Sequence, residues 1–383
     1  MKYRRFGKFD WQVSALGFGA MRFPIIGNDA SKIDEPEAAK MVKYAIDQGL
    51  NYVDTAYVYH RGNSETFLGK VLKHGYREKI KLTSKMPTWL VNSQQDMDKR
   101  LDEQLARLQT DYLDFYLLHG LTKERYQKLV ELNILKWAEK KMDEGKFNHL
   151  GFSFHDSLDA FKDIINSYDG WTLSQIQYNF MDADYQAGTE GLKFAASKGL
   201  AVIIMEPIAG GRLAIKPPKP VQDIWEGAEV KRTPAEWALM WVWNQPEVSV
   251  ALSGMSTMDQ VIENLNSADH SGPGVLTKRE LKLINRVAAE YKRLGFIACT
   301  GCRYCQPCPQ GVNIPEIMSL YNEFFVKDRD DAVKTKYWEH ITPESQAKRC
   351  QRCGTCERLC PQQLPIKNIL SHAAMIFEQE NAR

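Results

Sequence analysis

The stretch IKLTSKMPTWLVNSQQDMDKRLDEQLARLQTDYLDFYLLH, residues 80–119, contains a strand, a helix and a second strand in that order. The apolar runs at Ile80–Lys85 and Tyr112–His119 predict the two strands, and Gln94–Leu108 has the apolar period of a helix. Two strands joined by a helix of about ten or more residues form a parallel βαβ unit. This stretch therefore predicts a parallel sheet with helices packed on it.

The same alternation recurs before residue 270 and predicts eight strands in all. Six further strands are expected at Val13–Gly17, Tyr52–Ala56, Leu150–Phe154, Ser174–Tyr178, Ala201–Glu206 and Ser249–Ser253. Further helices are expected at Glu35–Gln48, Ser64–Lys73, Tyr126–Asp143, Leu158–Asn166, Thr189–Ser197, Thr233–Asn244 and Thr257–Asn266. Eight such units in about 260 residues fit an α/β fold of the closed (β/α)8 TIM barrel type better than an open doubly wound sheet. The turn GFGAMRFP at 17–24 also lacks the full G-x-G-x-x-G spacing of a dinucleotide-binding open sheet.

Length and turn residues predict two domains. A barrel alone uses about 250 residues, and the chain has 383. We expect the barrel to occupy residues 1–275, with the turn Ser271–Gly274 at its boundary. Residues 276–383 are then expected to form a linker helix, Lys278–Lys292, followed by a small cysteine-rich domain.

Charge and hydropathy limit the kinds of binding partner that we expect for this protein. The 50 Lys and Arg residues nearly balance the 48 Asp and Glu residues, giving a net charge of +2. Because no basic run is interleaved with aromatic residues, we expect no nucleic-acid partner. The longest apolar run, Leu200–Met205, is too short to cross a bilayer, and the start MKYRRFGKFDWQV lacks the apolar stretch of a signal peptide, so we expect no membrane partner and a cytoplasmic protein.

Four polar residues stand at or just after the ends of successive predicted strands. In a parallel barrel, the carboxyl ends of the strands share one rim, where active sites form. Tyr59 could donate a proton to a carbonyl oxygen, but a phenol has an ordinary pKa of about 10 and needs a nearby cation. Lys85 could be that cation, with Asp54 holding its ammonium and His119 orienting the oxygen. Each residue alone is more often an ordinary polar rim residue, and only the four together favour an acid-base device.

The motifs around these residues resemble those of the aldo-keto reductase family. The resemblance is carried by YVDTAYVYHRGNSETFLG at 52–69, LTSK at 82–85 and DFYLLH at 114–119, and it covers roughly residues 1–270. The opening YRRFGKFDWQVSALGFGAMRF at 3–23 is similar to the hairpin and first strand of that family. The resemblance implies an NAD(P)H-dependent oxidoreductase that interconverts a small-molecule carbonyl and alcohol. Its catalytic tetrad would be Asp54, Tyr59, Lys85 and His119.

The resemblance also implies a site for the nicotinamide cofactor. Ser153 and Gln175 would hold the carboxamide, and Tyr178 would stack on the nicotinamide ring. The segment MEPIAGGRL, Met205–Leu213, would enclose the pyrophosphate, and SGMSTMDQVIENL at 253–265 is similar to the adenosine end of the site. The cofactor-binding residues so implied are Ser153, Gln175, Tyr178, Pro207, Gly210, Gly211, Leu213, Gly254, Ser256, Gln260 and Asn264.

Two departures from the family pattern affect this site. Phe154 and His155 follow Ser153, where the family commonly has asparagine next. Residues 254–264, GMSTMDQVIEN, contain no Lys or Arg to pair with a 2′-phosphate, which carries about two negative charges. Between NAD(H) and NADP(H), the sequence therefore favours NADH.

All eight cysteines lie after residue 298, which in a cytosolic chain indicates metal or cluster ligation rather than disulfides. The second group, at 350–361, has the spacing C-x2-C-x2-C-x3-C-P of bacterial ferredoxins, and the first group, at 299–309, differs by one residue. Two [4Fe-4S] clusters are therefore expected, with structural zinc as the alternative. Three close cysteines of each group would hold one cluster, together with the last cysteine of the other group. The expected sets are Cys299, Cys302, Cys305 and Cys360 for one cluster, and Cys350, Cys353, Cys356 and Cys308 for the other.

The tail resembles a ferredoxin-like module with two clusters, and residues 309–349 between its cysteine groups are expected to be helical. A nicotinamide gives up two electrons together, whereas a cubane passes one at a time, and flavin is the usual intermediary. No flavin site is identified in the sequence. Three interpretations stay open: the clusters fold or dock the tail of a reductase, they exchange electrons with an external redox carrier protein, or the barrel has lost turnover and serves as a nicotinamide-binding module in electron transfer or redox sensing.

Overall fold

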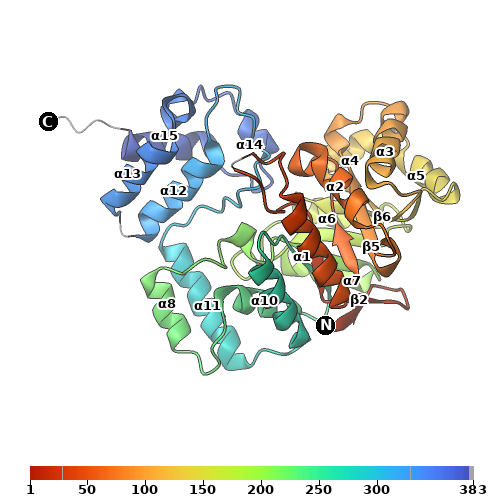
Figure 1. Cartoon of the computed structure of the whole chain (residues 1–383), viewed down its shortest axis with the longest axis horizontal. Coiled ribbons are helices and arrows are strands. Elements are labelled where there is room, and N and C mark those ends of the chain that lie inside the picture. Colours follow the sequence, from red (N-terminus) through yellow and green to blue (C-terminus); the bar gives the residue numbers. More distant parts are fainter. Residues whose placement is uncertain (28, 328, 379–383) are drawn as a thin grey trace. The chain divides into compact units, whose positions relative to one another are not determined.

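The computed structural model describes residues 1–27, 29–327 and 329–378, which fall into two compact units (Figure 1). The first unit comprises Met1–Pro207 and Ala235–Thr277. The second comprises Ile208–Pro234 together with the described residues from Lys278 onward. The segment 208–234, which the sequence assigned to the barrel domain, thus packs with the cysteine-rich part of the chain.

The first unit is built on a closed, fully parallel barrel of eight strands. The barrel strands are β3 (Leu16–Gly19), β4 (Tyr52–Asp54), β5 (Lys81–Met86), β6 (Leu113–Leu121), β7 (Phe147–Phe154), β8 (Leu173–Gln177), β9 (Ala201–Met205) and β10 (Val248–Ser253). They neighbour one another in sequence order, and β10 pairs with β3 to close the ring. The predicted TIM barrel is confirmed, because every expected strand has a counterpart.

Helices follow the barrel strands. They are α1 (Glu35–Asp47), α2 (Asn63–Val71), α3 (Gln94–Leu108), α4 (Lys123–Glu131), α5 (Ile134–Asp143), α6 (Leu158–Asn166), α7 (Gly188–Ser197), α9 (Pro234–Trp243) and α10 (Met258–Asp269). Ser93, Thr122 and Thr257 cap the first turns of α3, α4 and α10 with side-chain oxygens. The single helix expected at Tyr126–Asp143 is instead two helices, because Asn133 takes a left-handed conformation with a φ of 59°.

An N-terminal hairpin plugs one end of the barrel. Its strands are β1 (Tyr3–Arg5) and β2 (Gln12–Ser14), so the expected strand Val13–Gly17 is divided between the hairpin and β3. Phe6 in the hairpin loop stacks on Trp11, with ring centroids 4.6 Å apart, and also contacts Phe115. Phe6 belongs to a buried cluster with side chains from inside the barrel. The residues expected to form the acid-base site lie at the opposite, carboxyl ends of the strands.

The second unit is helical. Its helices are α8 (Lys219–Glu226), α11 (Lys278–Arg293), α12 (Ile314–Val326), α13 (Asp331–His340), α14 (Thr355–Leu359) and α15 (Ile366–Phe377). Helices α12 and α13 occupy much of the 309–349 segment, which confirms its expected helical character. Helix α8 lies beside α11 (Figure 1), and a half-buried ion pair between Arg232 and Glu280 joins the segment after α8 to α11. No helix among the residues described above is both long and apolar enough to span a membrane.

Candidate active site and cluster-binding pockets

The barrel register brings the expected acid-base residues to one rim. Asp54 is the last residue of β4, Lys85 is next to last in β5, and His119 lies near the end of β6. Neighbouring strands pair Asp54 with Thr83 and Lys85 with Leu117. Because the strands are parallel, the three side chains reach the same end of the barrel.

The ammonium of Lys85 lies at the centre of the hydrogen bonds at this rim. Its side chain is fully buried, and its ammonium donates to Asp54 Oδ1 at 2.5 Å and to the Thr55 carbonyl at 2.8 Å. The same nitrogen lies 3.3 Å from the hydroxyl of Tyr59. Tyr59 begins a short 3-10 turn and stays partly exposed. A buried ammonium therefore faces a phenol that a substrate can reach.

Burial disfavours the charges of Lys85 and Asp54, and the attraction between the two side chains acts against that effect. Burial lowers the pKa of the Lys85 amine, while the Asp54 carboxylate acts in the other direction. Burial likewise raises the pKa of the Asp54 carboxyl, while the Lys85 ammonium opposes the shift. A buried pair survives only where its geometry and hydrogen bonds compensate for lost hydration. Here Gln175 completes the set by donating to the second Asp54 oxygen at 3.1 Å.

His119 is neutral at the same rim. Burial lowers the pKa of its imidazole well below 6.5, and Lys85, His155 and Arg125 lower it further. Its ring stands edge-on to the Tyr59 ring, with centroids 6.1 Å apart and an interplanar angle of 85°. A neutral imidazole here can orient or polarise a carbonyl oxygen without taking the proton itself.

A buried polar network behind Lys85 was missed at the sequence level. Gln104, on α3, donates to the Lys85 carbonyl at 3.1 Å and to Glu65 at 2.6 Å. Glu65 also accepts from Ser84 at 2.6 Å and pairs with Arg107. Burial raises the pKa of the Glu65 carboxyl, against the effect of these donors. The network fixes the strand that carries Lys85.

The residues expected around the nicotinamide lie at the ends of β7 and β8. Ser153 is buried and accepts from the backbone amide of Gly120 at 2.7 Å. Gln175 is the residue that donates to Asp54, as described above. The ring of Tyr178 packs on Trp241, with centroids 4.8 Å apart, and its hydroxyl bonds to Thr189. The register of β7 and β8 pairs Ser153 directly with Gln175, so the two residues expected to bind the nicotinamide carboxamide are adjacent.

The residues expected at the adenosine end lie in the turn after β10 and on α10. Asn264 donates to Ser253, and Gln260 accepts from the Ser256 amide at 2.8 Å. Ser256 donates its hydroxyl to the backbone of Arg22 at 2.7 Å. A side chain at Gly254 would meet the aliphatic part of Arg22 at 3.0 Å. In the structure, the cationic residue Arg22 therefore lies beside this turn, although residues 254–264 themselves contain no Lys or Arg.

The expected pyrophosphate segment continues from the first unit into the second. Pro207 ends the first unit and is buried, whereas Gly210, Gly211 and Leu213 belong to the second unit. The amides of Gly211 and Leu213 both bond to the Ile208 carbonyl. Arg212 donates to the carbonyl of Ile297 at 2.5 Å, and a Cβ on Gly210 would lie 2.4 Å from the carbonyl oxygen of Thr300. Gly210 and Arg212, both in the second unit, therefore pack on the chain around Cys299.

The first cysteine pocket contains one of the expected ligand sets. The thiols that line it are those of Cys299, Cys302, Cys305 and Cys360, and its volume is about 360 Å³. Burial raises the pKa of the Cys305 thiol, and the neighbouring thiolates act in the same direction. Burial also raises the pKa of the Cys360 thiol, whereas hydrogen bonds from the backbone amides of residues 362–364 act to lower it. Crowded thiols with converging amides are the usual surroundings of an iron-sulfur cluster.

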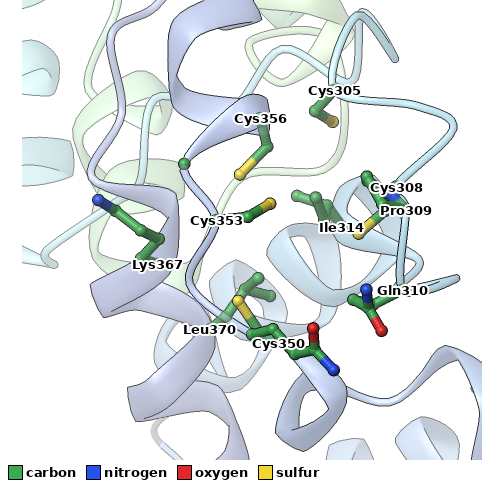
Figure 2. Close-up of a pocket in the computed structure, with 12 residues that line it drawn as sticks. Cys305, Cys308, Pro309, Gln310, Ile314, Cys350, Cys353, Cys356, Lys367 and Leu370 are labelled. Carbon is green, nitrogen blue, oxygen red and sulfur yellow. The ribbon is translucent and has the colours of Figure 1, made fainter.

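The second pocket, of about 350 Å³, contains the other expected set (Figure 2). Its lining includes Cys308, Cys350, Cys353 and Cys356, and Cys305 borders it as well. The sulfur of Cys350 accepts from the Arg352 amide at 3.4 Å. Cys353 is exposed, and hydrogen bonds from Thr355 lower the pKa of its thiol. Cys308, the last cysteine of the first group, thus lies with the first three cysteines of the second group. Cys360, the last cysteine of the second group, lies with the first three of the first group.

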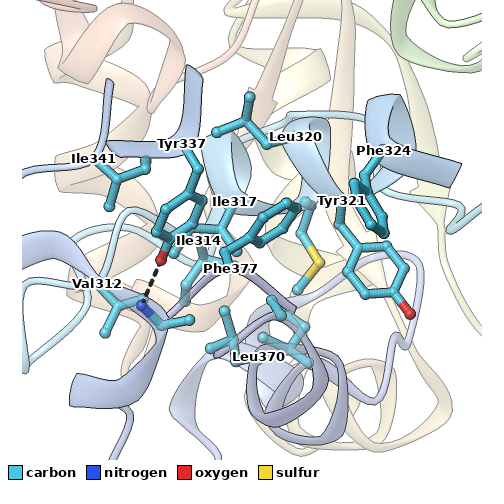
Figure 3. Close-up of a cluster of buried hydrophobic side chains, with 14 of the residues drawn as sticks. Val312, Ile314, Ile317, Leu320, Tyr321, Phe324, Tyr337, Ile341, Leu370 and Phe377 are labelled. Atoms are coloured by element: carbon cyan, nitrogen blue, oxygen red, sulfur yellow. Dashed lines mark hydrogen bonds between the residues drawn. The ribbon is translucent and has the colours of Figure 1, made fainter. Parts of the chain in front are cut away.

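Both pockets rest on one hydrophobic core. Ile314 lines both pockets and belongs to a buried cluster with side chains from α12, α13 and α15 (Figure 3). Within it, Tyr337 stacks on Phe377 with centroids 4.7 Å apart and accepts from the Ala347 amide at 3.1 Å. Five of the eight cysteines pack against this core while half-buried, and Cys356 is part of it. The core therefore positions thiols from both sequence groups.

Comparison with known families agrees with both parts of the chain. The Aldo/keto reductase family matches residues 15–288, and a 4Fe-4S dicluster domain matches residues 298–365. The protein Tas of Escherichia coli is 25% identical over 329 residues, covering 70% of this chain and 93% of its own. L-galactose dehydrogenase of Arabidopsis thaliana is 28% identical over 286 residues, covering 69% of this chain and 87% of its own.

Solved structures give the same result. Aldo-keto reductase AKR11C1 of Bacillus halodurans, in its holo form, is 28% identical with a TM-score of 0.61, over 75% of this chain and 96% of its own. An aldo-keto reductase of Klebsiella pneumoniae in complex with NADPH is 25% identical with a TM-score of 0.60, over 75% of this chain and 95% of its own. The 4Fe-4S match favours iron-sulfur clusters over the zinc alternative. The chain belongs to the aldo/keto reductase family and carries a 4Fe-4S dicluster domain after its barrel.

Proposed function

We propose that the barrel interconverts a small carbonyl compound and its alcohol, with Tyr59 as the proton donor and acceptor. The observation that carries this proposal is the 3.3 Å approach of the buried Lys85 ammonium to the Tyr59 hydroxyl. A cation at this distance stabilises the phenolate that remains after the proton has left. A pure binding module has no need of such a pair.

Each residue of the rim then has a distinct task. When bound, a reduced nicotinamide would supply the hydride for the carbonyl carbon. Tyr59 gives its proton to the carbonyl oxygen, and Lys85 stabilises the phenolate. Asp54 keeps Lys85 charged and in place, and neutral His119 orients the oxygen. In the direction of alcohol oxidation, Tyr59 takes the proton back.

An anaerobic screen tests this function directly. Aldehydes, ketones and sugars are offered with NADH and with NADPH, and oxidation of the nicotinamide is followed. We expect turnover of at least one carbonyl class by the wild type and a large loss in Lys85→Met. Turnover that survives in Lys85→Met would show that the cation is dispensable. A wild type without turnover of any carbonyl would favour the redox-sensing alternative.

For the cofactor, we propose that Arg22 helps the site to bind NADPH. The preference for NADH rested on the absence of Lys and Arg from residues 254–264. Arg22 packs on Gly254, and a guanidinium is the usual partner of a 2′-phosphate. We therefore propose that the site accepts NADPH as well as NADH. Arg22→Ala should raise KM for NADPH about tenfold, the worth of a single charge-assisted hydrogen bond, and leave that for NADH within about twofold. Equal losses would place Arg22 on the pyrophosphate that both cofactors share.

For the tail, we propose two [4Fe-4S] clusters with crossed ligands. The two pocket linings support this arrangement, because each includes three cysteines of one group and the last of the other, with Cys305 also bordering the second pocket. Cys360→Ala should then perturb the cluster of the first group, and Cys308→Ala that of the second. Iron analysis and electron paramagnetic resonance of each variant measure this. Loss of the second group's own cluster in Cys360→Ala would contradict the crossing.

We also propose that the second cluster exchanges electrons with an external carrier. The exposure of Cys353 supports this role, because a cluster that only stabilises the fold does not need access to solvent. Lys348, Arg349, Arg352 and Arg358, which are near it in the sequence, are exposed, and this favours an acidic partner. We expect the reduction of the clusters by an acidic flavodoxin to slow with added salt and in K348E/R349E. The exposed pair K73E/K193E on the barrel is the control. Equal rates in both double variants would leave the clusters a structural role.

A further inference from the structure

The turn that carries Tyr59 holds two residues in an uncommon backbone conformation. His60 and Arg61 have φ angles of 51° and 54°, in the left-handed region that residues other than glycine seldom occupy. Gly62, which follows them, has a φ of 94°. Successive non-glycine residues in this region persist only where the surrounding structure holds them there. The turn therefore depends on contacts outside itself.

His60 is buried and makes two such contacts with the loop that follows β3. Its Nε2 accepts from the backbone amide of Phe23 at 3.2 Å, and its Nδ1 lies 2.9 Å from the carbonyl oxygen of Ala30. Because an amide donates and a carbonyl accepts, the imidazole is neutral and carries its proton on Nδ1. Burial also lowers the pKa of this imidazole. The two bonds, together with the packing of the ring on Phe23 at 5.7 Å between centroids, fasten the turn to the loop.

The same loop reaches the turn expected to bind the adenosine end of the nucleotide. Arg22 directly precedes Phe23 in the chain. The Arg22 carbonyl accepts from the hydroxyl of Ser256 at 2.7 Å, and the aliphatic part of the Arg22 side chain lies against Gly254. One short stretch of backbone is thus held by the expected nucleotide-binding residues on one side and by His60 on the other.

The placement of the Tyr59 hydroxyl depends on this turn. The hydroxyl lies 3.3 Å from the Lys85 ammonium, and His60 is the next residue along the chain. A movement of the turn by about 1 Å would take the hydroxyl out of hydrogen-bond reach of the ammonium. A misplacement of that size can lower a catalytic rate by about 10²-fold. The side chain that fastens the turn therefore controls the distance on which proton transfer depends.

We propose that His60 is a positioning residue that couples the nucleotide site to Tyr59. A nucleotide held at Arg22 fixes the neighbouring amide of Phe23. That amide fixes the imidazole of His60, and the imidazole keeps the Tyr59 hydroxyl in place. This inference rests on the proposed function, because it takes Tyr59 as the proton donor and Arg22 as a contact of the nucleotide. In this account His60 itself touches neither the substrate nor the nucleotide.

Two substitutions separate the two bonds of the imidazole. A glutamine amide ends near the position of Nε2, so His60→Gln should keep the bond from the Phe23 amide. An asparagine amide ends near the position of Nδ1, so His60→Asn should keep only the bond to Ala30. We expect kcat to fall about tenfold to a hundredfold in His60→Asn and to stay within about threefold in His60→Gln. KM for the carbonyl should change less than about twofold in both variants, because His60 does not contact the substrate.

Backbone strain alone predicts the opposite order. Asparagine takes the left-handed conformation more readily than glutamine, so His60→Asn would be the more active variant if His60 only shaped the turn. That order, or equal kcat values in the wild type and both variants, would overturn the proposal. His74 is the matched control, because it has a φ of 60° and is exposed. His74→Asn and His74→Gln should both leave kcat unchanged.

Hydrogen–deuterium exchange tests the coupling without turnover, at concentrations of NADPH that saturate each variant. In the wild type, NADPH should slow the exchange of the amides of residues 58–64 by at least about twofold. His60→Gln should keep this protection, and His60→Asn should lose it. This pattern would support the coupling even if no carbonyl in the screen were reduced. Exchange at residues 58–64 that NADPH leaves unchanged in the wild type, or slows equally in both variants, would overturn it.

Discussion

Lys85 and Asp54 form a fully buried ion pair, with 2.5 Å between the ammonium and the carboxylate, at the carboxyl ends of two adjacent barrel strands. Burying two charges costs free energy that a pair of apolar side chains would not lose. The pair therefore indicates a functional requirement at this position. In our account, that requirement is a permanent positive charge beside Tyr59.

Asp54→Asn should damage both stability and catalysis. Removing one partner leaves a buried charge, which destabilises a protein by about 3–5 kcal/mol. Because the Asp54 carboxylate raises the pKa of Lys85, its loss should lower that pKa, and the ammonium should deprotonate at lower pH. The alkaline limb of the kcat profile should then shift to lower pH. Denaturant unfolding and a pH-rate profile measure the two effects, and an unshifted limb would separate Lys85 from catalysis.

Gln104→Leu should weaken the support of Lys85 from behind. The amide of Gln104 donates to Glu65, Ser84 and the Lys85 carbonyl, all of which are buried. Each buried group left without its partner destabilises the fold by about 1–3 kcal/mol. Gln94→Leu, at the exposed start of the same helix, is the control and should change the free energy of unfolding little. Equal effects of the two substitutions would contradict the importance of the network.

His155 should make the folded barrel sensitive to mild acid. Burial lowers its pKa from 6.5 to about 4, so between these values the unfolded chain binds a proton that the folded chain does not. The stability from this group is complete above pH 6.5 and is lost as the pH falls toward 4, by up to about 3 kcal/mol. His155→Gln should flatten this dependence in urea unfolding at pH 7 and pH 5. The exposed control His270→Gln should not flatten it.

Gly210→Ala should disturb the segment around Cys299. Gly210 has a φ of 69°, and an added Cβ would lie 2.4 Å from the Thr300 carbonyl oxygen. Gly211→Ala is a matched control, because Gly211 also has a positive φ but its Cβ would meet no atom within 4 Å. Cluster absorbance after anaerobic reconstitution should therefore fall in Gly210→Ala and be retained in Gly211→Ala. Similar spectra from both variants would mean that the contact with Thr300 is dispensable.

The barrel and its acid-base residues could be predicted because they depend on local patterns. Strand and helix periods repeat eight times, and a parallel barrel brings strand ends to one rim whatever the loops do. The predicted proximity of Asp54, Tyr59 and Lys85 therefore needed no knowledge of packing. Likewise, cysteine spacing suggested the two sets of four cysteines that are found among the linings of the two pockets.

The features that the sequence did not reveal depend on contacts between distant segments. Arg22 reaches Gly254 because β3 pairs with β10 to close the ring, so the loops after the first and last strands adjoin. The sequence could have indicated this proximity, because a closed barrel always places its first and last strands side by side. Glu65 and Gln104 meet through the packing of α2 on α3, which no local pattern specifies. The attachment of residues 208–234 to the second unit is of the same kind.

The most direct test of the central claim is a single-turnover measurement on Tyr59→Phe, made alongside the affinity of the same variant for the nicotinamide. We expect the rate of nicotinamide oxidation by a carbonyl substrate to fall about 10²–10⁴-fold, the usual worth of a positioned proton donor, while the dissociation constant for the nucleotide stays within about twofold. A rate equal to that of the wild type, with nucleotide affinity intact, would show that the proton comes from another group.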